Sequence, residues 1–178
     1  IRGISDFDMD YARNKGCRIK LIAHAAKLHP DHFTLFVMPK LVARDEYVFN
    51  VEDEFNGVVI EGECYDKQFM FGKGAGGFPT AASVLYDSTA RSYDYRYEYK
   101  KKNYFRHLNY STDCEVEIYL RYREASDFNL FDFETISERY SSLSDHYVVG
   151  TIMLDKLIEV QEDIRKKEVF VAFTGRID

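Results

Sequence analysis

Alternation of apolar and polar positions dominates the first part of the chain. Apolar side chains recur at every second position over residues 19–25 and again over residues 33–38, and turn-forming residues separate the two runs. A period of two is typical of strands, so the pattern predicts a hairpin over residues 18–38. The same reasoning predicts a second pair of strands over residues 55–61 and 68–71.

A helix is predicted ahead of the first hairpin. Ser5 stands at the position of an N-cap, and Asp8 follows three residues later, which is the spacing of a capping box. Gly16 supplies the residue type that most often ends a helix. These signals together predict a helix over residues 6–15.

The last third of the chain has a different pattern, in which predicted strands and helices alternate. The order strand, helix, strand, helix, strand is typical of a small α+β module whose helices cover one face of a sheet. The polar, tyrosine-rich stretch before it, residues 88–113, is predicted to be a connector. The five predicted segments are residues 115–122, 130–140, 146–154, 156–167 and 169–173.

Composition narrows the classes of function. The chain has 178 residues, of which 46% are hydrophobic, and this suffices for a continuous core. A net charge of −6 disfavours a nucleic-acid surface spread over the whole fold. The sequence has no apolar run of the ~20 residues that a membrane helix needs, and no signal-peptide pattern. Three scattered cysteines, Cys17, Cys64 and Cys114, favour the reducing environment of the cytoplasm.

A glycine-rich segment between a predicted strand and a short predicted helix at residues 80–86 is the strongest local signal. Gly72, Gly74 and Gly77 have the spacing of a dinucleotide-binding loop. Glycines let the main chain approach an anion closely, and the N-terminus of the helix offers N–H groups. A complete fingerprint also needs an acidic residue at the end of the following strand, and none follows here. Two interpretations stay open: a loop that faces a nucleotide, and a tight crossover that serves packing.

No other cluster predicts a catalytic residue or a metal ligand. His29 and His32 flank a turn with no thiol nearby, so a solvated hairpin tip is the expected role. Tyrosines alternate with charged residues over residues 93–99, a pattern that can stack on nucleic acid, but acidic residues dilute the positive charge. The many carboxylates lack a partnered nucleophile. Neither nucleic acid nor a membrane is an expected partner.

Four stretches, in order, resemble homoserine dehydrogenase in the part that closes its catalytic domain. The first three are ISDFDMDYARNKGCRIK at residues 4–20, MPKLV at residues 38–42 and NVEDEFNGVVIEGE at residues 50–63. The last, FGKGAGGFPTAASVLYD at residues 71–87, is the most specific, because a glycine loop, a Pro-Thr-Ala segment and a small-residue helix occur together in it. The similarity covers about half of the chain.

The resemblance implies an enzyme that reversibly oxidises homoserine to aspartate semialdehyde with NAD or NADP, in threonine and methionine biosynthesis. It implies that Gly72, Gly74, Ala75 and Gly76 approach the cofactor, and that residues 80–86 pack back on a nucleotide domain. The family's main dinucleotide strand, catalytic lysines and acidic substrate ligands precede this region, and no residue here matches them. We therefore expect a carboxy-terminal fragment, inactive by itself, of a homodimeric enzyme.

The resemblance also implies a regulatory ACT domain at the place of the terminal module. The order of the predicted elements approximates the β-α-β-β-α-β pattern of that domain. Two departures are that residues 141–154 are short for two paired strands, and that residues 127–130 replace the Pro-Gly-Val-Leu-like turn that opens its first helix. Two roles stay open for the module: binding an amino-acid effector, and packing or dimerisation alone.

The predicted fold class is α+β, with a mixed sheet and helices followed by a small ACT-like α+β module. Residues 1–87 are assigned to the end of the catalytic and dimerisation domain, residues 88–113 to a linker, and residues 114–178 to the module. The alternative to an enzyme fragment is a stand-alone amino-acid-sensing module without enzyme activity.

Overall fold

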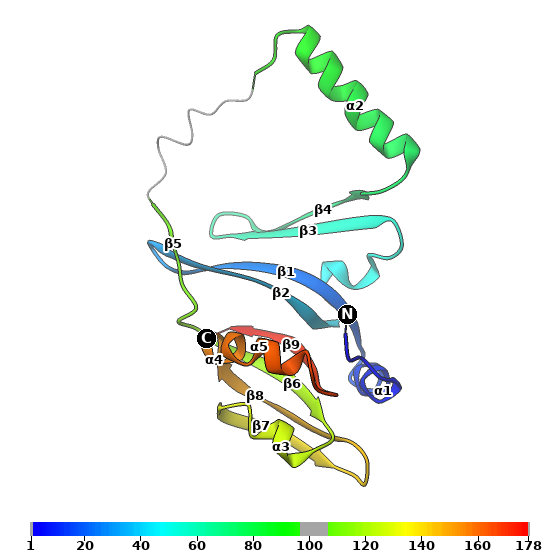
Figure 1. Cartoon of the computed structure of the whole chain (residues 1–178). Helices are drawn as coiled ribbons and strands as arrows, with labels where there is room; N and C mark the ends of the chain where they lie inside the picture. Colours follow the sequence, from blue (N-terminus) through cyan, green and yellow to red (C-terminus); the bar gives the residue numbers. More distant parts are fainter. Residues whose placement is uncertain (1, 97–106, 178) are drawn as a thin grey trace. The chain divides into compact units, whose positions relative to one another are not determined.

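The computed structural model describes residues 2–96 and 107–177, and the chain divides into two compact units (Figure 1). The first unit combines Ile1–Arg44 with His107–Asp178, and the second comprises Asp45–Arg106. This spatial grouping differs from the division along the chain predicted above, because the first hairpin lies with the carboxy-terminal residues.

A mixed sheet forms the centre of the first unit. Its main path has the strand order β1-β2-β9-β6-β8-β7, and β5 pairs with β2. Strand β2 runs parallel to β5 and β9, whereas the remaining neighbours are antiparallel. The strands are β1 Cys17–His29, β2 His32–Ala43, β5 Asn109–Tyr110, β6 Glu115–Tyr122, β7 Phe133–Ser141, β8 His146–Met153 and β9 Phe170–Ile177.

The amino-terminal part of the first unit confirms the predicted helix and hairpin. Helix α1 spans Asp6–Asn14, with Ser5 as its N-cap. Gly16 has φ +69°, the left-handed conformation that glycine adopts without strain, and the chain turns there into β1. Strands β1 and β2 form the predicted antiparallel hairpin.

The carboxy-terminal part of the first unit has the complete order β-α-β-β-α-β. Its four strands lie in the order β9-β6-β8-β7, which is the arrangement of a ferredoxin-like split β-α-β fold. Short helices lie in the two crossovers: α3 Ala125–Phe128, α4 Leu154–Glu159 and α5 Gln161–Ile164. The predicted class, α+β with a mixed sheet, is confirmed.

One predicted element is wrong. Residues 130–140 were expected to form a helix, but most of this stretch is β7, which pairs with β8. Phe133, Thr135, Ile136 and Tyr140 are β-branched or aromatic residues that favour strands, and pairing with an adjacent buried strand overrides a helical reading of their spacing. Strands β7 and β8 also supply the two paired strands of that pattern, because β7 begins well before residue 141.

Both faces of β6 are buried, which explains its position at the middle of the sheet. Val116, Ile118 and Leu120 belong to a core that includes Leu154 and Leu157 of α4. Tyr119, on the other face, belongs to a second core with residues of α1 and β9. The amino-terminal helix and the carboxy-terminal helices therefore cover opposite faces of the same sheet (Figure 1).

The second unit contains a two-stranded sheet and a long helix. Strand β3 (Phe55–Gly62) pairs antiparallel with β4 (Asp66–Lys73), which confirms the predicted strands, and a 3₁₀ turn η1 (Tyr47–Asn50) precedes them. Helix α2 spans Gly77–Ser92 and is longer than predicted. It extends into the stretch that was read as a connector. Part of the tyrosine-rich pattern, residues 97–106, lies outside the described residues.

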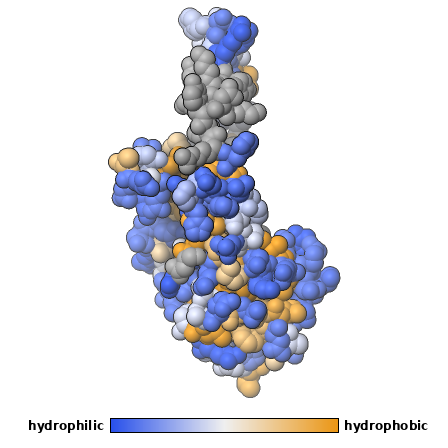
Figure 2. Space-filling view, turned by 90° about the vertical axis from the view of Figure 1, so that its left-hand side faces the viewer, coloured by the Kyte–Doolittle hydropathy of each residue, from blue (hydrophilic) through white to orange (hydrophobic). Residues whose placement is uncertain are grey.

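The surface visible in Figure 2 is mostly hydrophilic, with apolar residues interspersed among charged ones. Among the helices of the described residues, none combines the length and the apolar character needed to cross a membrane.

Candidate functional site: a glycine loop and a buried polar cluster

The four residues predicted to approach a cofactor lie at the junction of β4 and α2. Gly72 is near the end of β4, and Gly74, Ala75 and Gly76 form the connection to α2. All four are exposed. The structure therefore brings them together as one accessible loop, although it holds no ligand that would test their predicted role.

Two positions in this loop require glycine for different reasons. A Cβ atom on Gly74 would lie 1.6 Å from the side-chain amide nitrogen of Asn56, so the main chain packs directly against that amide. Gly76 has φ +116°, a conformation that L side chains rarely adopt. Gly72 is different, because a Cβ atom there would meet nothing within 4 Å. Packing explains the glycine at position 74 but not the one at position 72.

Hydrogen bonds fix the ends of the loop and leave its centre open. The Gly74 N–H donates to the carbonyl of Glu54 at 2.8 Å, and both the N–H and the hydroxyl of Thr80 donate to the carbonyl of Gly76. At the start of α2, the N–H groups of Gly77 and Phe78 have no acceptor among the described residues. An anion at this end of the helix would meet unpaired donors and the positive end of the helix dipole.

Helix α2 presents apolar side chains without a covering surface. None of its residues is buried, and the exposed fractions of Phe78, Leu85 and Tyr86 are 92%, 68% and 73%. An amphipathic helix normally buries its apolar side against another element. The apolar side chains of α2 have no such cover among the described residues.

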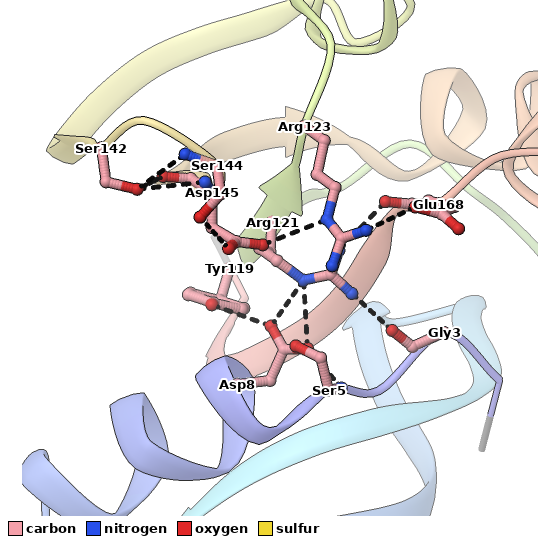
Figure 3. Close-up of polar contacts among 10 residues, drawn as sticks. All are labelled: Gly3, Ser5, Asp8, Tyr119, Arg121, Arg123, Ser142, Ser144, Asp145 and Glu168. Atoms are coloured by element: carbon pink, nitrogen blue, oxygen red, sulfur yellow. Dashed lines mark hydrogen bonds and ion pairs between the residues drawn. The ribbon is translucent and has the colours of Figure 1, made fainter.

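A buried carboxylate in the first unit forms a second polar feature, which the sequence did not single out as a site (Figure 3). Asp8 is completely buried and accepts hydrogen bonds from the N–H and the hydroxyl of Ser5, at 2.8 and 2.7 Å. The Tyr119 hydroxyl donates to Asp8 at 2.9 Å, and Arg121 Nε donates to both carboxylate oxygens at 3.1 Å. The sequence revealed Asp8 only as part of a capping box.

The guanidinium of Arg121 is held from several sides. Besides Asp8, it donates to the carbonyl oxygens of Glu168 and Gly3, and its side chain is 3% exposed. Figure 3 shows it between the segment before α1 and the segment that carries Glu168. Because the pair is nearly closed to solvent, it anchors α1 and the amino-terminal segment to the sheet.

Tyrosines surround this cluster, and their ionisation is suppressed. Burial raises the pKa of Tyr119, and the charge of Asp8 raises it further. Burial also raises the pKa of Tyr147 to about 12, with a contribution from its hydrogen bond to Glu138. Hydrogen bonds from Lys15 and Tyr147 lower the pKa of Glu138. These hydroxyls stay protonated at neutral pH and act as hydrogen-bond donors.

The remaining candidates from the sequence stay dispersed. The rings of His29 and His32 lie 6.3 Å apart at the tip of the β1–β2 hairpin. Cys17, Cys64 and Cys114 form no disulfide with one another. In the part of the chain that the structure describes, no group of three or more His, Cys, Asp or Glu side chains is placed to hold a metal ion.

Comparison with known proteins defines the family. The family model described as homoserine dehydrogenase matches residues 1–88. Homoserine dehydrogenase of Synechocystis sp. is 37% identical over 90 residues, which cover 49% of this chain and 21% of the relative. The enzyme of Helicobacter pylori is 34% identical over 87 residues, covering 49% of this chain and 20% of the relative. The chain thus spans about a fifth of the length of these relatives.

Solved structures extend the similarity in fold to the whole chain. A homoserine dehydrogenase from Thiobacillus denitrificans superposes with a TM-score of 0.70 and 21% identity, covering 100% of this chain and 45% of that one. The enzyme of S. aureus gives a TM-score of 0.55 with 18% identity, covering 94% of this chain and 43% of that one. The fold is thus that of part of a dehydrogenase. Residues 1–88 match the homoserine dehydrogenase family, and the rest of the chain is similar to the solved structures in fold alone.

The anchoring role of Asp8 predicts a large loss of stability on its removal. Asp8→Ala leaves the Arg121 guanidinium and the Tyr119 hydroxyl buried without their acceptor, and we expect a cost of about 3–5 kcal/mol. Tyr119→Phe removes only one hydrogen bond and is expected to cost about 1 kcal/mol. The measurement is urea unfolding, followed through the amide NMR signals of β6 so that only the first unit is observed.

Asp10→Ala is the matched control on the same helix. Asp10 pairs with Arg13, and both side chains are more than half exposed, so we expect a change below about 1 kcal/mol. Equal effects of the Asp8 and Asp10 substitutions would show that the buried pair is not an anchor.

Proposed function

We propose that the chain is a carboxy-terminal part of an NAD(P)-dependent homoserine dehydrogenase, an enzyme that interconverts homoserine and aspartate semialdehyde in the cytoplasm for threonine and methionine biosynthesis. The observation that carries the proposal is the family match over residues 1–88, which includes the whole glycine loop and the start of α2. In this proposal residues 1–87 complete the catalytic and dimerisation domain, residues 88–113 form a linker, and residues 114–178 form a regulatory module.

The glycine loop has properties that suit a contact with the cofactor. Gly72 is a glycine in open surroundings, which packing within the chain does not explain, and the first N–H groups of α2 lack acceptors among the described residues. A dinucleotide brings negatively charged phosphates, which bind at such helix ends. NAD(P), when bound, accepts the hydride from the substrate alcohol; the loop's part is to position it. Gly72, Gly74, Ala75 and Gly76 are the residues proposed to approach it.

The exposed apolar side of α2 supports a docking role for this helix. Phe78, Leu85 and Tyr86 would become buried against the nucleotide-binding domain of the complete enzyme. That contact would hold the loop at the cofactor. The catalytic residues are proposed to belong to the remainder of the enzyme, so that the chain by itself would not oxidise homoserine.

Gly74→Val in the complete enzyme tests the role of the loop. The new side chain would displace the Asn56 amide and hold the main chain away from the cofactor, so we expect the KM for NAD(P) to rise at least tenfold, a loss of about 1.4 kcal/mol in transition-state binding. The measurement is steady-state kinetics with the cofactor as the varied substrate. An unchanged KM would contradict the assignment.

Glu63→Val is the control for this experiment, because it introduces the same side chain into an exposed position at the opposite end of the β3–β4 hairpin. The KM of this variant for NAD(P) is expected to match that of the parent enzyme. The chain alone, assayed with homoserine and either cofactor, is expected to be inactive, and turnover by it would show that the catalytic residues lie within these residues.

The second unit also supports the proposal that the enzyme is a homodimer. Val58 and Met70 face each other across β3 and β4, and they are 52% and 53% exposed. Ile60, on the same face, is 39% exposed. An apolar sheet face of this kind normally meets another surface. We propose that the strands of residues 18–38 and 55–71, which belong to two separate sheets of this chain, both take part in the subunit contact of the dimer.

Val58→Asp is expected to shift the complete enzyme from dimer to monomer, because the carboxylate would be desolvated in an apolar interface. Light scattering coupled to size-exclusion chromatography measures the mass. Tyr65→Asp, in the turn between the strands, is the control and should leave the dimer intact. A parent enzyme that is monomeric at micromolar concentration would overturn the proposal.

A second candidate function is amino-acid sensing by the carboxy-terminal module, alone or as the regulatory part of the enzyme. The observation in its favour is the strand order β9-β6-β8-β7 with helices in both crossovers. We propose an ACT-like module on this ground, with an amino acid as its effector.

Calorimetric titration of the full chain with threonine tests the second candidate. If the module is a sensor, we expect threonine to bind saturably to this chain in the absence of any other part of the enzyme. Alanine serves as the comparison ligand. No heat with threonine or related amino acids at millimolar concentration would reject a sensor and leave packing as the role of the module.

A further inference from the structure

A pocket of about 410 Å³ in the first unit has a markedly basic lining. It lies among the segment before α1, the end of β6 and the loop before β9. Only one lining residue, Glu168, is acidic. The chain carries 24 Lys and Arg against 30 Asp and Glu, so its composition does not account for this concentration of positive charge. The basic lining residues are Arg2, Arg121, Arg123, Arg165, Lys166 and Lys167.

The wall of the pocket formed by β6 is rigid. Arg121 uses three of its five N–H groups on Asp8 and on the carbonyls of Gly3 and Glu168, and the other two have no acceptor among the described residues. Arg123 lies two residues further on and donates to the Glu168 carboxylate at 2.7 Å. Figure 3 shows both arginine side chains extending toward Glu168. The fixed guanidinium of Arg121 and the exposed guanidinium of Arg123 therefore lie at the same wall of the pocket.

The exposed cations of the pocket are held by weak partners. Arg165 pairs with Glu162 at 2.7 Å, and Lys166 pairs with Asp163 at 3.5 Å; all four side chains are more than half exposed. Exposed ion pairs contribute little to stability, so these cations can turn to a ligand at small cost. Lys167, paired with Asp127, and Arg123, which also contacts Asp145, are less exposed.

We propose that this pocket binds a small anion that carries two or more phosphate groups. The cations described above already pair with carboxylates of the chain, and this decides the class of ligand. A ligand with one carboxylate would only replace one singly charged partner by another and would gain no binding free energy. Phosphate groups carry more charge and accept paired hydrogen bonds from guanidinium groups. A linked chain of them can reach cations from several segments at once. The pocket volume lies in the range of small-molecule sites.

This inference does not rest on the proposed dehydrogenase function. All lining residues belong to the first unit, whereas the glycine loop belongs to the second. An enzyme fragment and a stand-alone module would both carry the pocket.

Titration of the full chain with inorganic tripolyphosphate tests the proposal. Calorimetry gives the affinity, and the side-chain N–H NMR signals of Arg121, Arg123 and Arg165 report the location. The titration is repeated with citrate, a multivalent anion built of carboxylates, and with pyrophosphate, all at about 0.15 M ionic strength to screen non-specific attraction. We expect tripolyphosphate to bind at least tenfold more tightly than citrate and to shift the arginine signals.

The double variant R165Q/K166Q is expected to weaken tripolyphosphate binding at least tenfold, because both substitutions remove charge from the pocket. The double variant R13Q/K156Q is the matched control, because it also removes one arginine and one lysine from exposed pairs three residues apart, Arg13–Asp10 and Lys156–Glu159. Neither residue lines the pocket, and binding should stay within twofold of the parent chain.

Three results would overturn the proposal. The first is tripolyphosphate binding no tighter than citrate binding. The second is an equal loss of affinity in the two double variants, which would indicate attraction by net charge alone. The third is a set of NMR changes that leaves the arginine signals of the pocket in place.

Discussion

The first unit depends on one buried ion pair. Asp8 and Arg121 lie 113 residues apart in the sequence, and their contact has no access to solvent. Removing two charges from water is costly, and such a pair is tolerated only where further hydrogen bonds complete it. Ser5, Tyr119 and two carbonyl groups do this here. One carboxylate therefore caps a helix at its own end of the chain and attaches that helix to a strand from the other.

Local signals in the sequence predicted local structure well. Ser5, Asp8 and Gly16 define the first helix, and the period of two defines both hairpins. Stretch 133–141 was misread because its strand state depends on β8, a partner that local spacing does not reveal. The role of Arg121 was missed for the same reason. Its only sequence signal is a cation within the otherwise apolar residues 118–122 of β6.

The candidate cofactor loop shows what a sequence motif alone can indicate about the role of each glycine. The glycine spacing left a packing role and a ligand role open, and the geometry shows which glycines the local structure itself favours. A side chain at Gly74 would have to displace the Asn56 amide, Gly76 has a backbone conformation that L side chains rarely adopt, and Gly72 has neither constraint. The local structure therefore favours glycine at positions 74 and 76 without any cofactor. The ligand role therefore depends most on the family match, which spans this loop, and on the unpaired donors that follow it.

The position of β9 has a consequence for biosynthesis. This strand lies between the hairpin strand β2 and the central strand β6, so it connects the amino-terminal part of the sheet to the rest. During translation the ribosome makes the hairpin of β1 and β2 before β9, the strand that joins the hairpin to β6. Part of one edge of β2 therefore stays unpaired until β9 has been made. Such late, non-local pairing is slow and exposes nascent chains to aggregation, which makes chaperone protection of the hairpin advantageous.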